Sequence, residues 1–221
     1  MIEGLEGVDF LSDDIQWNFH GLYNYVLTVE RQIGSFLKEE EERLERTLSR
    51  DDPEKAGYLW SAHERLHGEL IPRTFRYSCV VSLTTAIDAT LASIARFVHG
   101  STSLSFVFKS NAGRLYAQQW RYFHNVAGPL TRLPFMDKLD DLTTARNCMV
   151  HAAGNVRNYR YQKQAEGAVE GLPGFVLSEE GMIDLAAEGV PPLIDEARKW
   201  LLDVWGAVFQ HVNEAEEATR H

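Results

Sequence analysis

The longest periodic pattern in the chain covers residues 13–48, and its period is that of an α-helix. Apolar side chains recur there every three or four residues, which places them on one helical face. They are Ile15, Phe19, Leu22, Val26, Val29, Ile33, Phe36 and Leu37. A single helix of this length favours an all-α fold.

The rest of the sequence repeats this pattern in shorter segments. Helices are predicted over residues 53–70, 74–98, 112–126, 137–154 and 193–212. Two short apolar runs, 175–177 and 182–185, flank a turn and predict a small β-hairpin before the last helix. We therefore expect a helical bundle of about five to six helices. The expected division is an N-terminal helical extension, 1–70, and a helical domain, 71–221, packed as one unit.

Composition points to a water-soluble globular protein. Apolar residues make up 44% of the 221 positions, and no apolar run was found that approaches the roughly 18 residues of a membrane span. The N-terminus is acidic and lacks a signal-peptide pattern. The two cysteines, Cys79 and Cys148, form no metal-binding or disulfide pattern. These features favour a cytoplasmic protein with no metal, no cofactor and no membrane contact.

Charge is distributed unevenly along the chain. Residues 1–70 carry 7 basic and 16 acidic side chains, and residues 164–221 carry 3 and 12, so each segment has a net charge of -9. Residues 71–163 carry 12 basic and 4 acidic side chains, a net charge of +8. A locally positive surface suits an anionic ligand such as nucleic acid. The alternative is that these cations simply pair with the acidic flanks.

The most distinctive polar residues lie on the predicted helix 137–154. Its apolar residues Leu139, Leu142, Ala145, Met149 and Val150 have the spacing of a buried face, and Gly154 stands where a helix ends. Asn147 and His151 are four residues apart and share a side. Arg146 and His151 are five apart, roughly 140° around the axis and about 7.5 Å along it. Fraying near Gly154, or a second copy of the helix, would bring them to one phosphate.

One acidic residue stands out in the apolar helix 74–98. Asp88 is the sole carboxylate between positions 71 and 136. A buried unpaired charge is costly, so Asp88 either pairs with Arg146 or lies in solvent.

Basic and aromatic residues interleave directly after the central helix. Such a mixture suits phosphate contacts and base stacking, although it also occurs in ordinary loops. We expect an RNA-binding set that includes two arginines of the predicted helix 112–126. Its members are Arg114, Arg121, Arg157, Tyr159, Arg160, Tyr161 and Lys163.

These residues resemble the motif of the HEPN superfamily. Its members carry Arg-polar-x-x-x-His on a helix that comes after an apolar helix with an acidic residue. The matching residues are Arg146, Asn147 and His151, with Asp88 on the preceding helix. The predicted hairpin and last helix also resemble the segment after the motif in many bacterial HEPN proteins. The resemblance covers about residues 72–213.

The resemblance implies a metal-independent endoribonuclease, acting as a toxin or a phage-defence effector. It implies catalytic roles for Arg146, His151 and Asn147, and a supporting role for Asp88. The implied partners are RNA, a second copy of the chain in a homodimer, and an antitoxin or other defence-system protein.

Two other classes of function stay open. One is a non-catalytic HEPN-like module that binds RNA, a nucleotide or a protein. The other is a structural helical dimer that assembles through the helix 13–48, in which Arg146 and His151 are structural. Loss of metal-free RNA cleavage in His151→Ala would separate the ribonuclease hypothesis from both alternatives.

Overall fold

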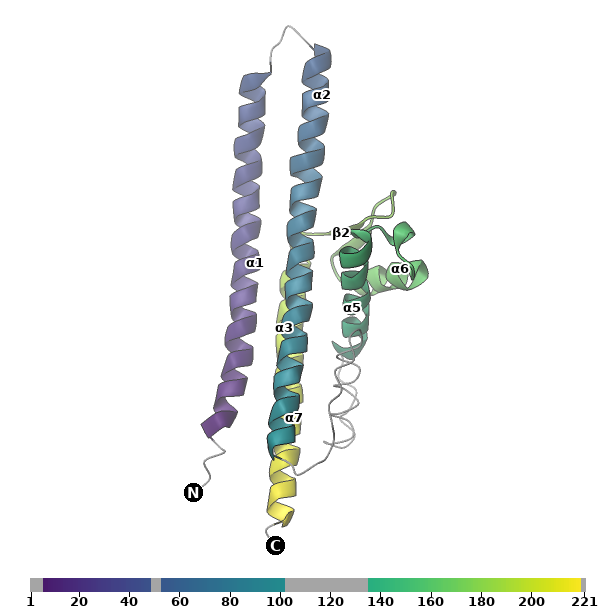
Figure 1. The fold of residues 1–221 in the computed structure, drawn as a ribbon. Coiled ribbons are helices and arrows are strands. Elements are labelled where there is room, and N and C mark those ends of the chain that lie inside the picture. The colour runs from purple at the N-terminus through teal and green to yellow at the C-terminus, as the bar shows by residue number, and fades with distance from the viewer. Residues whose placement is uncertain (1–5, 49–52, 102–134, 220–221) are drawn as a thin grey trace. The chain divides into compact units, whose positions relative to one another are not determined.

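A computed structural model describes residues 6–48, 53–101 and 135–219 of the chain (Figure 1). The elements, in chain order, are α1 (Glu6–Thr47), α2 (Pro53–His63), the π-helix η1 (Glu64–Leu70), α3 (Ile71–Ser101), α5 (Phe135–Ala152), the 3-10 helix η2 (Val156–Asn158), α6 (Gln162–Gly171), β1 (Phe175–Leu177), β2 (Ile183–Leu185) and α7 (Val190–Thr219). The predicted fold class, all-α with a small antiparallel hairpin before the last helix, is confirmed.

The chain forms two compact units, which are described separately. The first unit comprises the described residues of Met1–Leu22, Leu83–Asp140 and Leu193–His221. The second unit comprises those of Tyr23–Ser82 and Asp141–Pro192. The predicted boundary at residue 70 stays a prediction.

The described core of the first unit consists mainly of apolar residues from α1, α3 and α7. Phe97 of α3 packs edge-on against Trp205 of α7, with ring centroids 4.9 Å apart. The other residues buried here recur every three or four positions, as expected of amphipathic helices. They include Ile15, Phe19, Leu83, Ile87, Leu91, Ile94, Leu193, Ala197, Leu201, Val204 and Val208.

The second unit contains a helical hairpin made by the end of α1 and the segment that runs from α2 through η1 into α3. Phe36 stacks on His67, and Tyr25 meets Phe75, with ring centroids 5.6 Å and 6.2 Å apart. Residue numbers rise on one arm as they fall on the other, so the two arms are antiparallel. The predicted helix end before Pro53 is confirmed, because α1 ends at Thr47 and α2 begins at Pro53.

The predicted break before residue 74 is wrong, because helical structure continues through Pro72. A proline lacks the amide proton of a normal helical bond, and its ring clashes with the carbonyl four residues earlier. The wider turns of η1 directly precede Pro72, and the amide of Ile71 donates to the carbonyl of Leu66, five residues back. The residue four positions before Pro72 is Gly68, which adds no side chain to this crowded turn.

The second unit also contains the β-hairpin and a short helix. The register of the hairpin pairs Phe175 with Leu185 and Leu177 with Ile183. The helix α6 was not predicted, because its glycines favour irregular structure. It nevertheless forms and buries Ala165, Ala168 and Val169 along one face.

Within the described residues, one helical stretch is long and apolar enough to cross a membrane by length and composition alone. It lies within Pro53–Phe97, and 44% of its most apolar 18-residue window is buried inside the protein. The sequence-based statement that no apolar run approaches this length is therefore corrected. Since a core helix passes the same test, the finding is weak evidence for a span, and the absence of membrane contact stays an expectation.

Candidate functional site

The helix α5 ends where the sequence predicted. Ala153 and Gly154 take positive φ values of 50° and 79°, which stops the helix directly after Ala152. The amide of Gly154 donates to the carbonyl of Cys148 at 3.2 Å and closes the last turn. Of the five residues predicted to form the buried face, only Val150 is exposed, with 47% of its surface accessible.

Arg146 and Asn147 are joined by a hydrogen bond between their side chains. Nη1 of Arg146 donates to Oδ1 of Asn147 at 2.9 Å, and both residues are partly buried. His151 lies in the last turn of α5 and is exposed. Asn147 precedes His151 by four residues and lies about 40° from it around the axis. The hydrogen bond therefore turns the guanidinium toward the helical side that carries the imidazole.

Residues 146–151 are all α-helical, so fraying near Gly154 does not bring Arg146 and His151 together. Their positions on α5 remain about 140° apart around the axis and about 7.5 Å along it. No hydrogen bond joins the two side chains in the described part of the chain.

The segment after α5 gathers three of the predicted RNA-binding residues. The guanidinium of Arg160 lies over the ring of Tyr161, 5.3 Å from its centroid, and the ring of Tyr159 meets Tyr161 edge-on at 5.8 Å. Tyr161 and Lys163 are exposed. Tyr159 is partly buried, and this burial raises the pKa of its phenol.

Arg157 is the exception in this segment, because a structural contact engages its guanidinium. Nη2 of Arg157 donates to the carbonyl of Glu179 at 2.5 Å, and its side chain lies against Gly181. Its contribution to RNA binding stays a prediction.

Three other predicted site residues are not among the described residues of the second unit. Arg114 and Arg121 lie outside the described residues. Asp88 lies on α3 in the first unit, whereas Arg146 lies in the second. The predicted pairing of Asp88 with Arg146 therefore stays a prediction.

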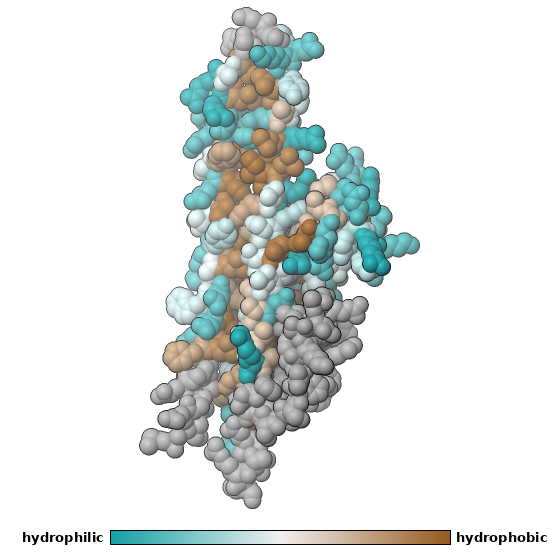
Figure 2. Space-filling view, in the orientation of Figure 1, coloured by the Kyte–Doolittle hydropathy of each residue, from teal (hydrophilic) through white to brown (hydrophobic). Residues whose placement is uncertain are grey.

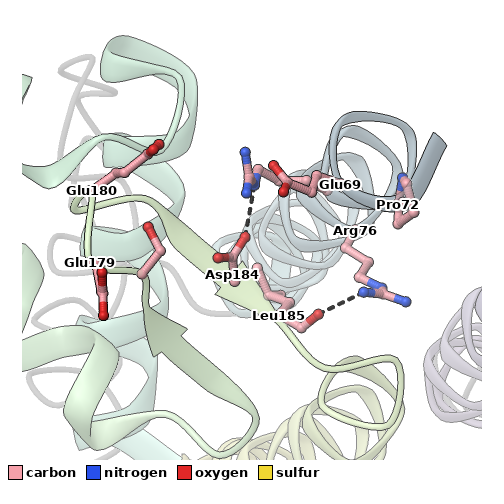
Figure 3. A pocket seen from close by; sticks show the side chains of 10 residues that line it. Glu69, Pro72, Arg76, Glu179, Glu180, Asp184 and Leu185 are labelled. Atoms are coloured by element: carbon pink, nitrogen blue, oxygen red, sulfur yellow. Dashed lines mark hydrogen bonds and ion pairs between the residues drawn. The ribbon is translucent and has the colours of Figure 1, made fainter. Parts of the chain in front are cut away.

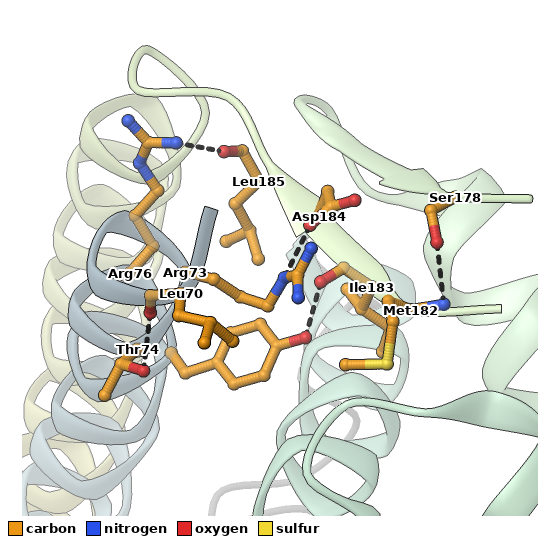
Figure 4. A network of polar contacts seen from close by, with 10 residues as sticks. Leu70, Arg73, Thr74, Arg76, Ser178, Met182, Ile183, Asp184 and Leu185 are labelled. Carbon is orange, nitrogen blue, oxygen red and sulfur yellow. Dashed lines mark hydrogen bonds and ion pairs between the residues drawn. The ribbon is translucent and has the colours of Figure 1, made fainter. Parts of the chain in front are cut away.

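A set of polar residues that sequence reasoning missed attaches α3 to β2 (Figure 4). Arg73 donates through Nε to Oδ1 of Asp184 at 2.7 Å, and Arg76 donates through Nη1 to the carbonyl of Leu185 at 2.8 Å. Tyr77 donates its hydroxyl proton to the carbonyl of Ile183 at 2.5 Å. Three successive residues of β2 are thus bonded to one side of α3. The available signal was the three- and four-residue spacing of Arg73, Arg76 and Tyr77.

Some cations of the basic segment, residues 71–163, pair with acidic residues of the segments on either side. Arg76 forms a two-pronged pair with Glu30, with distances of 2.7 Å from Nε and 3.0 Å from Nη2, and this hydrogen bonding raises its pKa. Arg73 forms an ion pair with Asp184 at 2.7 Å, and Lys138 forms one with Glu196 at 2.5 Å. For these three cations the pairing alternative holds, so they contribute little to an anion-binding surface.

A cleft of about 460 Å³ lies beside this contact (Figure 3). Glu179 and Glu180 of the turn between β1 and β2 line one side, and Pro72 and Arg76 of α3 line the other. Its remaining lining residues are Gly68, Glu69, Arg73, Ser178, Asp184 and Leu185. The lining contains four carboxylates and only two arginines, and both arginines are already paired with acidic residues. The cleft therefore does not suit the negative charge of a phosphate backbone.

Among the side chains that the structure places, in residues 10–48, 53–97, 138–210, 212–214 and 217, no group of three or more His, Cys, Asp or Glu could hold a metal ion. The absence of a metal stays an expectation. His63 and His67, four residues apart, have ring centroids 4.5 Å apart and are partly buried between Trp60 and Phe36.

Comparison with known proteins gave no match: no family model, no curated protein and no solved structure matches this sequence.

Proposed function

We propose that the chain is a metal-independent endoribonuclease of the HEPN type. The observation that carries the proposal is the hydrogen bond of Arg146 to Asn147, which turns a cation toward the side of α5 that exposes His151. A guanidinium and an accessible imidazole on one helical end can stabilise charge on a phosphate and move protons, and the amide orients the guanidinium. The basic and aromatic segment after α5 supplies contacts for the rest of the strand.

The chemistry is set by the substrate. An RNA strand carries its own nucleophile, the 2'-hydroxyl, so the protein needs to move protons and to stabilise negative charge. His151 acts as the base toward that hydroxyl or as the acid toward the leaving 5' oxygen, because an imidazole can both accept and donate a proton. The guanidinium fork of Arg146 stabilises the anion that forms on the phosphate. The expected product ends in a 2',3'-cyclic phosphate.

A homodimer completes this site. Arg146 and His151 of one chain leave the helix about 140° apart and share no hydrogen bond in the described residues, so one phosphate is best served by Arg146 of one copy and His151 of the other. If the C-terminal ends of two α5 helices face each other across a two-fold axis, the dimer contains two such sites, each with Arg146 of one copy and His151 of the other. The prediction is that mixing Arg146→Ala and His151→Ala chains restores cleavage that neither variant has alone.

RNA binding outside the reacting phosphate is assigned to the segment after α5. Arg160 and Lys163 are exposed cations suited to phosphates, and the accessible ring of Tyr161 offers a surface for an unpaired base. Base–aromatic stacking contributes about 1–3 kcal/mol per base.

The test is cleavage of RNA by the purified chain in excess EDTA. The wild type should cleave, whereas His151→Ala and Arg146→Ala should lose at least about a hundredfold in rate. The matched controls are His20→Ala and Arg31→Ala, which replace exposed residues of the same types on α1. The controls should cleave as the wild type does. RNA binding without cleavage in the wild type would favour the non-catalytic module.

The cellular role that we propose is that of a toxin or a phage-defence effector, held inactive by an antitoxin or another defence-system protein. Expression of the wild-type chain alone should then arrest bacterial growth, and expression of His151→Ala should not. Equal growth of the two strains at equal protein levels would contradict this role.

A structural dimer is the second candidate, and one observation favours it. The helical hairpin of the second unit exposes large apolar side chains, among them Phe36 at 42%, Leu66 at 48% and Leu70 at 43%. Figure 2 shows hydrophobic residues on its surface where α1 and α2 lie. If assembly were the whole function, Phe36→Ser with Leu70→Ser would abolish it, and His151→Ala would have no effect.

A further inference from the structure

The hydroxyl of Tyr77 lies at the junction of α3, β2 and the end of α5. It donates to the carbonyl of Ile183, a residue with no exposed surface. The amide of the same Ile183 donates to the carbonyl of Gly154 at 2.9 Å. One residue of β2 therefore connects Tyr77 to the turn that ends α5, and burial raises the pKa of the Tyr77 phenol so that it keeps its proton.

Tyr77 also touches that turn directly. A Cβ atom placed on Gly154 would overlap the Tyr77 hydroxyl and ring, so the phenol fits against the bare backbone of this glycine. Gly154 is itself bonded back to Cys148 inside α5. Beyond it, the amide of Val156 donates to the carbonyl of Gly181 at 2.9 Å, which extends the pairing between the turn and the hairpin.

His151 depends on this backbone for its position. The imidazole is exposed, and no side-chain hydrogen bond to the described part of the chain holds it. Its placement therefore depends on the last turn of α5. That turn is closed by the hydrogen bond from the amide of Gly154, three residues after His151, to the carbonyl of Cys148, three residues before it. Displacing a reacting group by about 1 Å can lower the rate about a hundredfold.

We propose that Tyr77 is a positioning residue for His151: its hydroxyl, bonded to Ile183 and packed on Gly154, fixes the end of α5 and so the backbone position from which the imidazole projects. This inference rests on the proposed ribonuclease function. It adds a residue outside the HEPN-like motif to the site, and it gives the β-hairpin a role in catalysis.

Tyr77→Phe tests the proposal, because it removes the hydroxyl and keeps the ring. The matched control is Tyr58→Phe, which removes a hydroxyl from a side chain that is 74% exposed on α2. We expect kcat for RNA cleavage to fall at least about tenfold in Tyr77→Phe, with KM within about twofold of the wild type. Tyr58→Phe should match the wild type in both constants.

Hydrogen–deuterium exchange provides a readout that does not need activity. The amides of Gly154, Val156 and Ile183 should exchange faster in Tyr77→Phe, while those of α7 keep their wild-type protection. If the wild type cleaves no RNA, the proposed function fails, yet this exchange pattern still supports a fixed α5 end. Unchanged exchange, an unchanged kcat, or a fall in kcat that merely tracks the loss of folded protein by circular dichroism would overturn the proposal.

Discussion

Oδ1 of Asn147 accepts a hydrogen bond from Nη1 of Arg146 at 2.9 Å, and the two side chains leave α5 about 100° apart. A neighbouring pair on a helix does not normally face each other, so the long arginine side chain must bend toward the amide. The bond uses one of the five donors of the guanidinium and leaves others available for a phosphate. Asn147 therefore orients Arg146 without neutralising it.

Replacing Asn147 tests this orienting role. In Asn147→Ala the arginine loses its acceptor, and we expect single-turnover RNA cleavage to fall about tenfold to a hundredfold. Asn147→Asp keeps an acceptor but pairs its charge with the guanidinium, so cleavage should also fall while the melting temperature holds or rises. Cleavage by Asn147→Ala at the wild-type rate would show that the bond has no part in catalysis.

Gly154→Ala should destabilise the protein by at least about 2 kcal/mol. An alanine at a φ of 79° costs about 1–2 kcal/mol, and its methyl group would overlap the partly buried Tyr77 side chain. The matched control is Gly167→Ala in α6, where a Cβ meets nothing within 4 Å. That control should stabilise the helix by about 0.5–1 kcal/mol. Urea unfolding measures both, and equal effects of the two alanines would refute the argument.

Arg76→Lys should weaken the attachment of α3 to its neighbours. A lysine cannot reproduce the two-pronged pair with Glu30 together with the bond to the Leu185 carbonyl. We expect a loss of about 1.5–3 kcal/mol in the free energy of unfolding. Arg43→Lys, on an arginine side chain that is 72% exposed and pairs with Glu40, should change it by less than about 0.5 kcal/mol. A similar loss in both variants would contradict the difference in burial.

Stability should decline at alkaline pH because of two buried thiols. Burial raises the pKa of Cys79 and of Cys148 from 9.0 to about 11. Between about pH 9 and pH 11 the folded chain therefore keeps these protons while the unfolded chain releases them. The contribution of each thiol to the free energy of unfolding is fully present below pH 9 and is lost as the pH rises toward 11. At pH 10 the loss is about 1 kcal/mol per thiol.

Urea midpoints at pH 8 and pH 10 measure this effect. The wild type should lose stability between the two values, and a Cys79→Ala, Cys148→Ala double variant should lose less. Both thiols should also resist labelling reagents at pH 8 until the protein unfolds, because they are buried and protonated. Rapid labelling of the native protein, or an identical pH dependence in the double variant, would contradict the assignment.

The helices were predictable because their apolar spacing is strong and local. Residues 13–48 carry an apolar stripe, and α1 covers nearly all of them. The end of α5 was predictable for a similar reason, since Gly154 is suited to the positive φ that it adopts. By contrast, α6 was missed because its helical face consists of two alanines and one valine between glycines, and neighbouring elements rather than propensity make it a helix.

The candidate site was predictable only in part. The sequence identified Arg146, Asn147 and His151 as a group, but the bond between Arg146 and Asn147 depends on side-chain rotamers that no spacing rule specifies. Tyr77 was missed because its partners, Gly154 and Ile183, lie 77 and 106 positions further along the chain. Such contacts arise from tertiary packing, and the spacing of Arg73, Arg76 and Tyr77 shows that they share one side of a helix but not which distant residues they meet.

The central claim is that RNA is cut by its own 2'-hydroxyl with the help of Arg146 and His151. The most direct measurement is the chemistry of the product ends after 5'-labelled RNA is incubated with the purified chain in excess EDTA. The prediction is a 2',3'-cyclic phosphate on one fragment and a 5'-hydroxyl on the other, with neither formed by His151→Ala. Fragments ending in a 3'-hydroxyl and a 5'-phosphate, or intact RNA with the wild-type chain, would contradict the claim.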